Sequence, residues 1–149
     1  MDKKVCVITG ASKGIGLACA QKFIENGYIV VSGSRSNENP INSPDFHFFK
    51  TDVAKEEDVK NLVAKTLENF GKIDVFINNA GFGLFANLAD STTEEFDSMF
   101  AVNVRGLYLC CRYAVKSMIE KQSGIIINIA SIAGKSFVPT ASIYCATKH

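Results

Sequence analysis

The chain has 149 residues, of which 47% are hydrophobic and 21% charged, a composition typical of one globular domain with a real core. Its formal net charge is +1, so bulk charge gives no support to binding of nucleic acid or of a membrane surface. The five cysteines and two histidines form no metal-ligand spacing, and the apolar run at residues 5–8 is too short for a signal peptide or a membrane span. These features predict a cytoplasmic protein with free thiols and no metal site.

The first half of the chain alternates apolar runs with one helical pattern. Runs of apolar, β-branched and aromatic residues predict strands, and apolar residues spaced three or four apart before Gly27 predict a helix. A polar stretch with two prolines predicts a loop. In chain order we expect a strand at 5–9, a helix at 15–26, a strand at 28–32, a loop at 34–44 and a strand at 46–50.

The second half continues the alternation. The clearest helical pattern ends at Gly71, and a longer helix follows Ser91 or Thr92 as its N-cap. In chain order we expect a helix at 56–70, a strand at 74–78, a helix at 93–120, a strand at 125–130 and the start of a helix near Thr140. Strands that are apolar throughout and alternate with helices predict an α/β fold, with a parallel sheet covered on both faces. We expect one domain over residues 1–149.

The segment between the first strand and the first helix is rich in glycine. Its spacing, GxxxGxG, differs from the widespread GxGxxG, and no GK[ST] follows, so it is not a P-loop. Glycines at a strand-to-helix junction allow the backbone to approach a phosphate, which the free N–H groups of the helix N-terminus then bind. The alternative is a turn that needs glycine only for its backbone angles. The residues expected to contact a dinucleotide here are Gly10, Ser12, Lys13, Gly14, Ile15 and Gly16.

The residues after the second strand indicate which dinucleotide binds. An acidic side chain about 20 residues beyond the glycine loop would grip a ribose 2′-hydroxyl and favour NAD. The sequence has Arg35 at this place and no acid, and Lys13 in the glycine loop is a second cation. Two cations without a carboxylate favour the 2′-phosphate of NADP, with NAD as the less favoured cofactor. The alternative is that Arg35 is a solvated loop residue.

A tyrosine and a lysine stand four residues apart near the end of the sequence. Tyr144 and Lys148 would lie one turn apart on the same face of a helix. An ammonium group at that distance eases the loss of a phenolic proton, which would let the tyrosine act as an acid and a base. The alternative is an ordinary helix surface, because both residue types are common there.

Six motifs stand in one order along the chain. They are Thr9-Gly10 with Gly14-Ile15-Gly16, then Asp52-Val53, Asn78-Asn79-Ala80-Gly81, Asn103, Ser131, and Tyr144 with Lys148. On these motifs the sequence resembles the short-chain dehydrogenase/reductase family over residues 5–149. Each motif taken singly also has a structural explanation, such as a turn, a helix cap or a strand end. The complete set favours the family.

The resemblance implies a Rossmann-type doubly wound fold and a site for hydride transfer. Tyr144 would be the general acid/base, Lys148 would assist it and bind the nicotinamide ribose, and Ser131 would hold the substrate oxygen. Asn103 would hold a water that extends the proton relay. Besides the glycine loop and Arg35, the implied cofactor contacts are Asp52, Val53, Asn79, Ala80, Gly81, Tyr144 and Lys148.

The function predicted from this resemblance is an NADP-dependent oxidoreductase that interconverts a carbonyl and an alcohol. The alternatives are a non-catalytic dinucleotide-binding module or sensor, and a gene fragment with no function of its own. The expected partner is a small-molecule carbonyl or alcohol, and neither nucleic acid nor a membrane is expected. The substrate itself cannot be identified, because the side chains expected near the site indicate only that this part of the pocket is apolar. They are Phe82, Leu84, Phe85 and Phe137.

Members of the family run to roughly 250 residues, within the range for one domain. The resemblance therefore implies a truncated member that ends after its fifth strand and the start of the next helix. We expect an incomplete domain of little or no activity, in which the strand at 125–130 is an exposed, aggregation-prone edge.

Members of the family also form dimers and tetramers, so the full-length form is expected to be a homodimer or homotetramer. The stripe at 105–120 would pack against a second copy or, alternatively, would only cover the sheet. Its residues are Leu107, Cys110, Cys111, Ala114 and Met118.

Overall fold

The computed structural model describes residues 3–36 and 40–149, so residues 37–39 of the predicted loop lie outside the described part. Within that part, five strands form one parallel sheet in the order β3-β2-β1-β4-β5. The strands are β1 (Val5–Thr9), β2 (Ile29–Ser34), β3 (Phe46–Lys50), β4 (Val75–Asn78) and β5 (Ile125–Asn128). The α-helices are α1 (Gly14–Glu25), α2 (Glu56–Phe70), α3 (Thr93–Phe100), α4 (Leu107–Lys121) and α5 (Ser142–Lys148).

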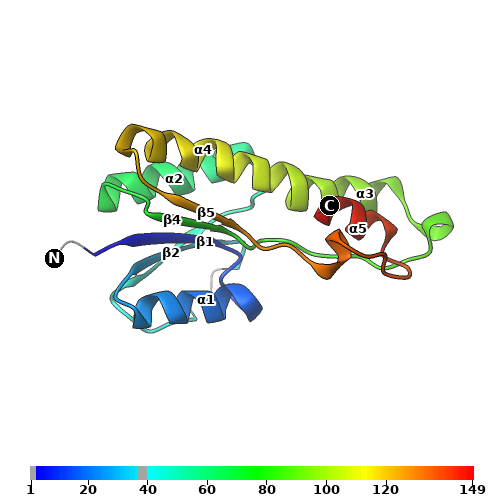
Figure 1. Cartoon of the computed structure of the whole chain (residues 1–149), viewed down its shortest axis with the longest axis horizontal. Coiled ribbons are helices and arrows are strands. Elements are labelled where there is room, and N and C mark those ends of the chain that lie inside the picture. Colours follow the sequence, from blue (N-terminus) through cyan, green and yellow to red (C-terminus); the bar gives the residue numbers. More distant parts are fainter. Residues whose placement is uncertain (1–2, 37–39) are drawn as a thin grey trace.

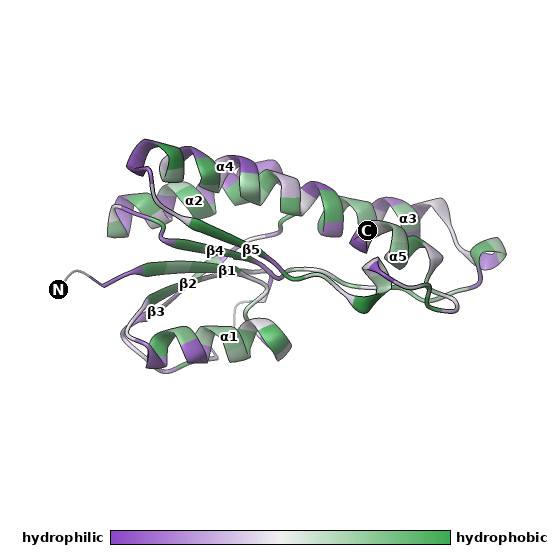
Figure 2. Cartoon of the chain, viewed as in Figure 1, coloured by the Kyte–Doolittle hydropathy of each residue, from purple (hydrophilic) through white to green (hydrophobic). Residues whose placement is uncertain are grey.

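Helices cover both faces of the sheet, as Figure 1 shows: α1 lies on one face, and α2 and α4 lie side by side on the other. The side chains of β1 alternate between these layers, because successive residues of a strand point to opposite faces. Val5 and Val7 belong to the core under α2 and α4, whereas Cys6 and Ile8 belong to the core under α1. Strand β1 is buried along its whole length, and so are β4 and nearly all of β2, whereas β3 and β5 at the two edges are only partly covered. Figure 2 shows the apolar stretches of the sheet in green between the helix layers. The predicted α/β fold is therefore confirmed.

The strand order places a cleft at the carboxyl ends of the strands. The chain runs from β1 outward to β2 and β3, then returns to pair β4 with the other side of β1. In open parallel sheets a crevice forms where the strand order reverses in this way, and ligands bind there. Helix α5 and the start of α3 lie beyond this edge of the sheet, past the carboxyl ends of β1 and β4 (Figure 1).

The long helix predicted at 93–120 contains a feature that periodicity does not reveal. It begins with a complete capping box, in which the Thr92 side chain accepts from Glu95 N–H and the Glu95 side chain accepts from Thr92 N–H. The helix then widens into a π-helical segment, η2 (Ala101–Gly106), before α4 continues it. Asn103 lies inside this segment and is buried. Single π-helical turns inside α-helices are frequent at functional sites.

The apolar stripe predicted on this helix faces the sheet. Cys110, Ala114 and Met118 are buried and belong to the core between α2, α4 and the strands. These three residues fit the second interpretation, that the stripe covers the sheet, whereas Leu107 and Cys111 are half-buried and a contact with a second copy stays a prediction. A different side of the same helix exposes apolar side chains, among them Tyr108 and Ile119.

Strand β5 is an edge of the sheet, because it pairs only with β4. Its side chains are poorly covered, and Ile125 is 58% exposed. This matches the expected exposed apolar edge, and its tendency to aggregate stays a prediction. All five cysteines are free thiols, and burial raises the pKa of Cys110 to about 12 and that of Cys6 well above its usual range. No helix among the described residues is both long and apolar enough to cross a membrane.

Candidate functional site

A cleft of about 900 Å³ opens at the carboxyl ends of the strands. Every predicted site residue lines it except Gly16 and Asn103, which lie directly behind its wall. The predicted residues that line it are Gly10, Ser12, Lys13, Gly14, Ile15, Arg35, Asp52, Val53, Asn79, Ala80, Gly81, Ser131, Tyr144 and Lys148. The fold thus brings residues from six separate motifs to one place.

The glycine loop is joined to the end of β4 by hydrogen bonds between Thr9 and Asn79. The Thr9 hydroxyl oxygen accepts from the backbone N–H groups of Asn79 and Ala80, each at 3.1 Å. In return, the Asn79 side-chain amide donates to the carbonyl oxygens of Thr9 and Gly10, each at 3.0 Å. These four bonds hold the loop at the switch point of the sheet, so the backbone that faces a ligand is fixed before the ligand arrives.

The glycines of the loop serve different purposes. A Cβ on Gly16 would lie 2.5 Å from the Asn79 amide nitrogen and 2.5 Å from the Gly10 carbonyl oxygen, so Gly16 is required for packing. Gly14 has a φ of +59° and nothing within 4 Å of its Cβ position, which leaves the cleft open at the N-terminus of α1. No side chain caps this terminus, so its N–H groups are available to a phosphate.

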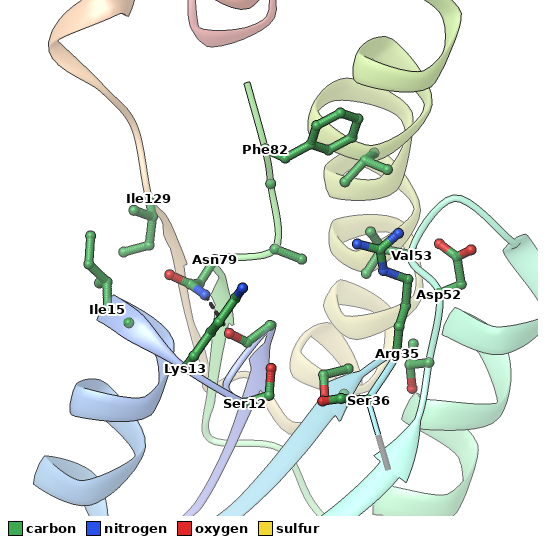
Figure 3. A pocket seen from close by; sticks show the side chains of 18 of the residues that line it. Ser12, Lys13, Ile15, Arg35, Ser36, Asp52, Val53, Asn79, Phe82 and Ile129 are labelled. Atoms are coloured by element: carbon green, nitrogen blue, oxygen red, sulfur yellow. Dashed lines mark hydrogen bonds between the residues drawn. The ribbon is translucent and has the colours of Figure 1, made fainter. Parts of the chain in front are cut away.

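The charges of the cleft suit an anion. Among the described residues, its lining carries three cations, Lys13, Arg35 and Lys148, and one carboxylate, Asp52. In Figure 3, Ser12 and Lys13 of the glycine loop face Arg35 and Ser36, which follow β2. Lys13 and Arg35 are both exposed to solvent.

Asp52 lies in a turn before α2 and is not its N-cap, which is Lys55. Its carboxylate accepts from Ala54 N–H at 3.1 Å, which is the structural part of a turn leading into α2. Its own N–H donates to the Asp58 carboxylate at 2.9 Å. Asp52 and Val53 nevertheless line the cleft, on the same side as Arg35 in Figure 3. The turn therefore presents both residues to a ligand.

Tyr144 and Lys148 lie one turn apart on α5, as the spacing predicted. The Lys148 ammonium is 5.9 Å from the centre of the Tyr144 ring and donates to the Ile129 carbonyl oxygen at 3.1 Å. Ser131 lines the same end of the cleft, and its hydroxyl oxygen accepts from Ala133 N–H at 3.2 Å. That bond uses the oxygen only, so the Ser131 hydroxyl proton is free to be donated to a ligand.

Asn103 is 4% exposed, and its hydrogen bonds connect the segment after β4 with α5 beneath the surface of the cleft. Its amide oxygen accepts from Phe82 N–H at 3.0 Å, and its amide nitrogen donates to the Phe82 carbonyl oxygen at 2.8 Å. The same nitrogen donates to the Thr147 hydroxyl at 2.9 Å, and Thr147 donates to the Tyr144 carbonyl oxygen at 2.8 Å. Both amide hydrogens are therefore committed. The predicted role of Asn103 in holding a water stays a prediction, whereas its role in seating α5 is visible.

Several residues of the site were missed by sequence reasoning. Thr147 is buried and carries the hydrogen bonds described above, yet a threonine inside a helix gives no distinctive signal. Thr9 belongs to the glycine motif, but the sequence did not predict that its hydroxyl joins the glycine loop to β4. The missed lining residues lie near an element end or in the π-helical segment: Gly33, Ser34, Ser36, Thr51, Val102, Ile129 and Ala130. The topology could have pointed to those at strand ends, because the carboxyl ends of parallel strands meet at one edge. No group of three possible metal ligands lies together among the described residues.

Comparison with known proteins places this arrangement in a family. The family model described as short chain dehydrogenase matches residues 4–149. The chain belongs to the short-chain dehydrogenase family. It is thus a member of a family of oxidoreductases, and the Rossmann-type doubly wound fold is the one expected of it.

Individual short-chain dehydrogenases resemble the chain over nearly all its length. An uncharacterized oxidoreductase of Thermotoga maritima is 39% identical over 99% of this chain and 61% of the relative. The 2-(R)-hydroxypropyl-CoM dehydrogenase of Xanthobacter autotrophicus is 38% identical over 97% of this chain and 63% of the relative. The solved structure of ElxO with NADP bound is 38% identical and superposes with a TM-score of 0.94, covering 99% of this chain and 63% of that chain. The chain thus spans a little over three fifths of the length of these proteins.

Proposed function

We propose that this protein is an NADP-dependent oxidoreductase that interconverts a carbonyl and an alcohol, with Tyr144 as the general acid/base. The observation that carries the proposal is one cleft with two chemically distinct groups of residues. Lys13 and Arg35 follow β1 and β2, whereas Ser131 follows β5, and Tyr144 and Lys148 lie on α5, so the two groups line the cleft from different elements on either side of the strand order. The first group suits a phosphate, and the second suits a reacting carbonyl oxygen.

The residues present fit NADP. The open space at Gly14 and the uncapped N-terminus of α1 suit a pyrophosphate. Arg35 at the end of β2, with Lys13 opposite, would hold the 2′-phosphate, and among the described residues 33–36 that line the cleft there is no acidic side chain to bind a ribose hydroxyl instead. The similar structure of ElxO has NADP bound, which supports NADP as the cofactor here.

The second group of residues supplies acid/base groups. A bound nicotinamide provides or accepts the hydride, and the protein provides orientation and electrostatics. Reduction places negative charge on the carbonyl oxygen, to which Ser131 and Tyr144 would donate hydrogen bonds. Tyr144 then transfers its proton to that oxygen, or accepts one from the alcohol in the reverse direction. Lys148 stabilises the charge left on the phenol and would bind the nicotinamide ribose.

The test is turnover of the full-length protein with and without the phenolic hydroxyl, because the 149 residues span only a little over three fifths of their relatives' length. Tyr144→Phe should bind NADPH as the parent does but reduce carbonyl compounds about 10²- to 10⁴-fold more slowly, the usual contribution of a general acid. Tyr28→Phe is the matched control, because Tyr28 lies just before β2, outside the cleft, with its ring against Phe23 of α1. NADPH binding without reduction of any carbonyl, in parent and variant alike, would favour the non-catalytic sensor instead.

We also propose that a second copy of the protein packs along the exposed side of α3 and α4. The side chains that support this recur at intervals of four, seven or eight residues across the two helices and the π-helical segment between them. They are Phe96, Val104, Tyr108, Val115 and Ile119. Their exposure is unusual for apolar residues in a regular row, which is typical of a surface that another helix covers.

A further inference from the structure

Two glycines of the segment that follows β4 face the acid/base groups. A Cβ on Gly81 would lie 3.1 Å from the Asn103 amide oxygen and 3.6 Å from the Lys148 nitrogen. A Cβ on Gly83 would lie 3.0 Å from Cδ2 and 3.2 Å from Cγ of Tyr144. The segment therefore presents bare backbone to three of the four predicted catalytic side chains.

The requirement at Gly83 is one of space. Its φ lies outside the left-handed region, so an alanine could adopt the same backbone conformation. The space is limited on two sides, because the new methyl group would also lie 3.2 Å from Cζ of Phe85. Ordinary van der Waals contacts of carbon atoms are about 3.5 to 4.0 Å. A methyl group at this position would therefore have to displace one of the two rings or the segment itself.

The segment is held too firmly to yield. Asn103 binds both the N–H and the carbonyl of Phe82, the residue before Gly83, at 3.0 and 2.8 Å. The backbone of Tyr144 is held through Thr147, which also binds Asn103. With both backbones anchored to one buried amide, the side-chain rings are the parts free to move. Any displacement caused at Gly83 must therefore fall on the Tyr144 and Phe85 rings.

We propose that Gly83 is a positioning residue for Tyr144, and this rests on the proposed function. Its missing side chain allows the phenol ring to lie against the backbone, and Phe85 closes the other side. The Phe85 and Tyr144 rings are 5.9 Å apart at a tilt of 55°, a stable arrangement for an aromatic pair. The Tyr144 ring, which extends from α5, is thereby held between the Gly83 backbone and the Phe85 ring. These contacts fix the direction of its hydroxyl.

Gly83→Ala tests the proposal through kinetics. Acid/base groups must be held within about 0.5 Å of their working position, and a misplacement of 1 Å costs about 100-fold. A shift of a few tenths of an ångström should lower kcat roughly tenfold, with KM for NADPH within about twofold of the parent, because the glycine loop and Arg35 are untouched. Adding Phe85→Leu to Gly83→Ala makes room for the new methyl group on the Phe85 side. The double variant should therefore recover roughly a third of the difference in kcat between the parent and Gly83→Ala.

A second measurement reports the ring itself and needs no turnover. The protein has four tyrosines, so fluorotyrosine labelling gives four ¹⁹F resonances, and Tyr144→Phe identifies the one from Tyr144. Gly83→Ala should shift this resonance and leave the other three in place. An unchanged Tyr144 resonance, or a shifted resonance with unchanged kcat, would overturn the proposal. Absence of turnover in the parent protein would count against the proposed function, and the ¹⁹F result would still decide whether Gly83 seats the ring.

Discussion

Replacement of Thr9 by valine should weaken both the fold and the dinucleotide site. Thr9 is 1% exposed, and its hydroxyl oxygen accepts from two backbone N–H groups, those of Asn79 and Ala80. Valine has nearly the same shape but no oxygen, so both N–H groups lose their partner. Because these groups connect the glycine loop to β4, the loop should become less well fixed as stability falls.

The size of the effect follows from those two bonds. A buried polar group that loses its partner costs about 1–3 kcal/mol. Asn79 and Ala80 are only half-buried and face the cleft, where water reaches them, so we take the low end for each. The free energy of unfolding should therefore fall by about 2 kcal/mol. For a chain of this size that corresponds to a Tm lower by about 4–8 °C.

Urea unfolding followed by circular dichroism measures this change, and NADPH titration of the same samples measures the site. Thr9→Ser is the matched control, because it keeps the acceptor oxygen and loses only a methyl group. We expect Thr9→Val to be clearly less stable than Thr9→Ser and to bind NADPH more weakly. Equal stabilities within about 0.5 kcal/mol, the spread of neutral substitutions, would refute the role assigned to the hydroxyl.

Two further predictions concern the thiols and the exposed helix face. Burial raises the pKa of Cys110 to about 12 and that of Cys6 still further, so neither thiol should react with a disulfide reagent at neutral pH until the protein unfolds. Half-buried Cys19 and Cys145 should react first, and equal rates for all five would contradict this burial. Ile119 is 68% exposed on the proposed contact with a second copy. Ile119→Lys should therefore shift the sedimentation distribution towards the monomer without loss of helix content. An unchanged sedimentation distribution would contradict the proposed contact on this side of α4.

Much of the fold could be predicted from the sequence, because its signals are local. The bounds of β1, β3 and α2 are those expected, since each is an apolar run or a clear helical pattern that ends at a glycine or a polar residue. The strand expected at 125–130 ends at Asn128, because β4, its one partner, ends at Asn78. The π-helical segment could not be foreseen: the apolar spacing continues through it, and Asn103 makes its hydrogen bonds to residues distant in sequence.

The same distinction between local signals and distant contacts applies to the site residues. Gly10, Tyr144 and Lys148 were found because a motif needs those residue types at a fixed spacing. Thr147 was not found, and the bonding role of the Thr9 hydroxyl was not predicted, because both depend on which groups the fold places beside them. The apolar stripe of α4 was ambiguous for a related reason, since a helix between a sheet and solvent carries apolar residues on both sides and the spacing does not tell which side is buried.

The most direct test of the account is the affinity of the protein for NADPH relative to NADH, measured by fluorescence titration. A charge-assisted hydrogen bond to the 2′-phosphate contributes about 1.5–3 kcal/mol, so the parent should bind NADPH at least tenfold more tightly. Arg35→Ala should remove most of this preference and leave NADH binding within about twofold. Lys116→Ala removes the same charge from an exposed position on α4 and should change neither affinity. Equal affinities of the parent protein for the two cofactors would contradict the assignment of this cleft to NADP.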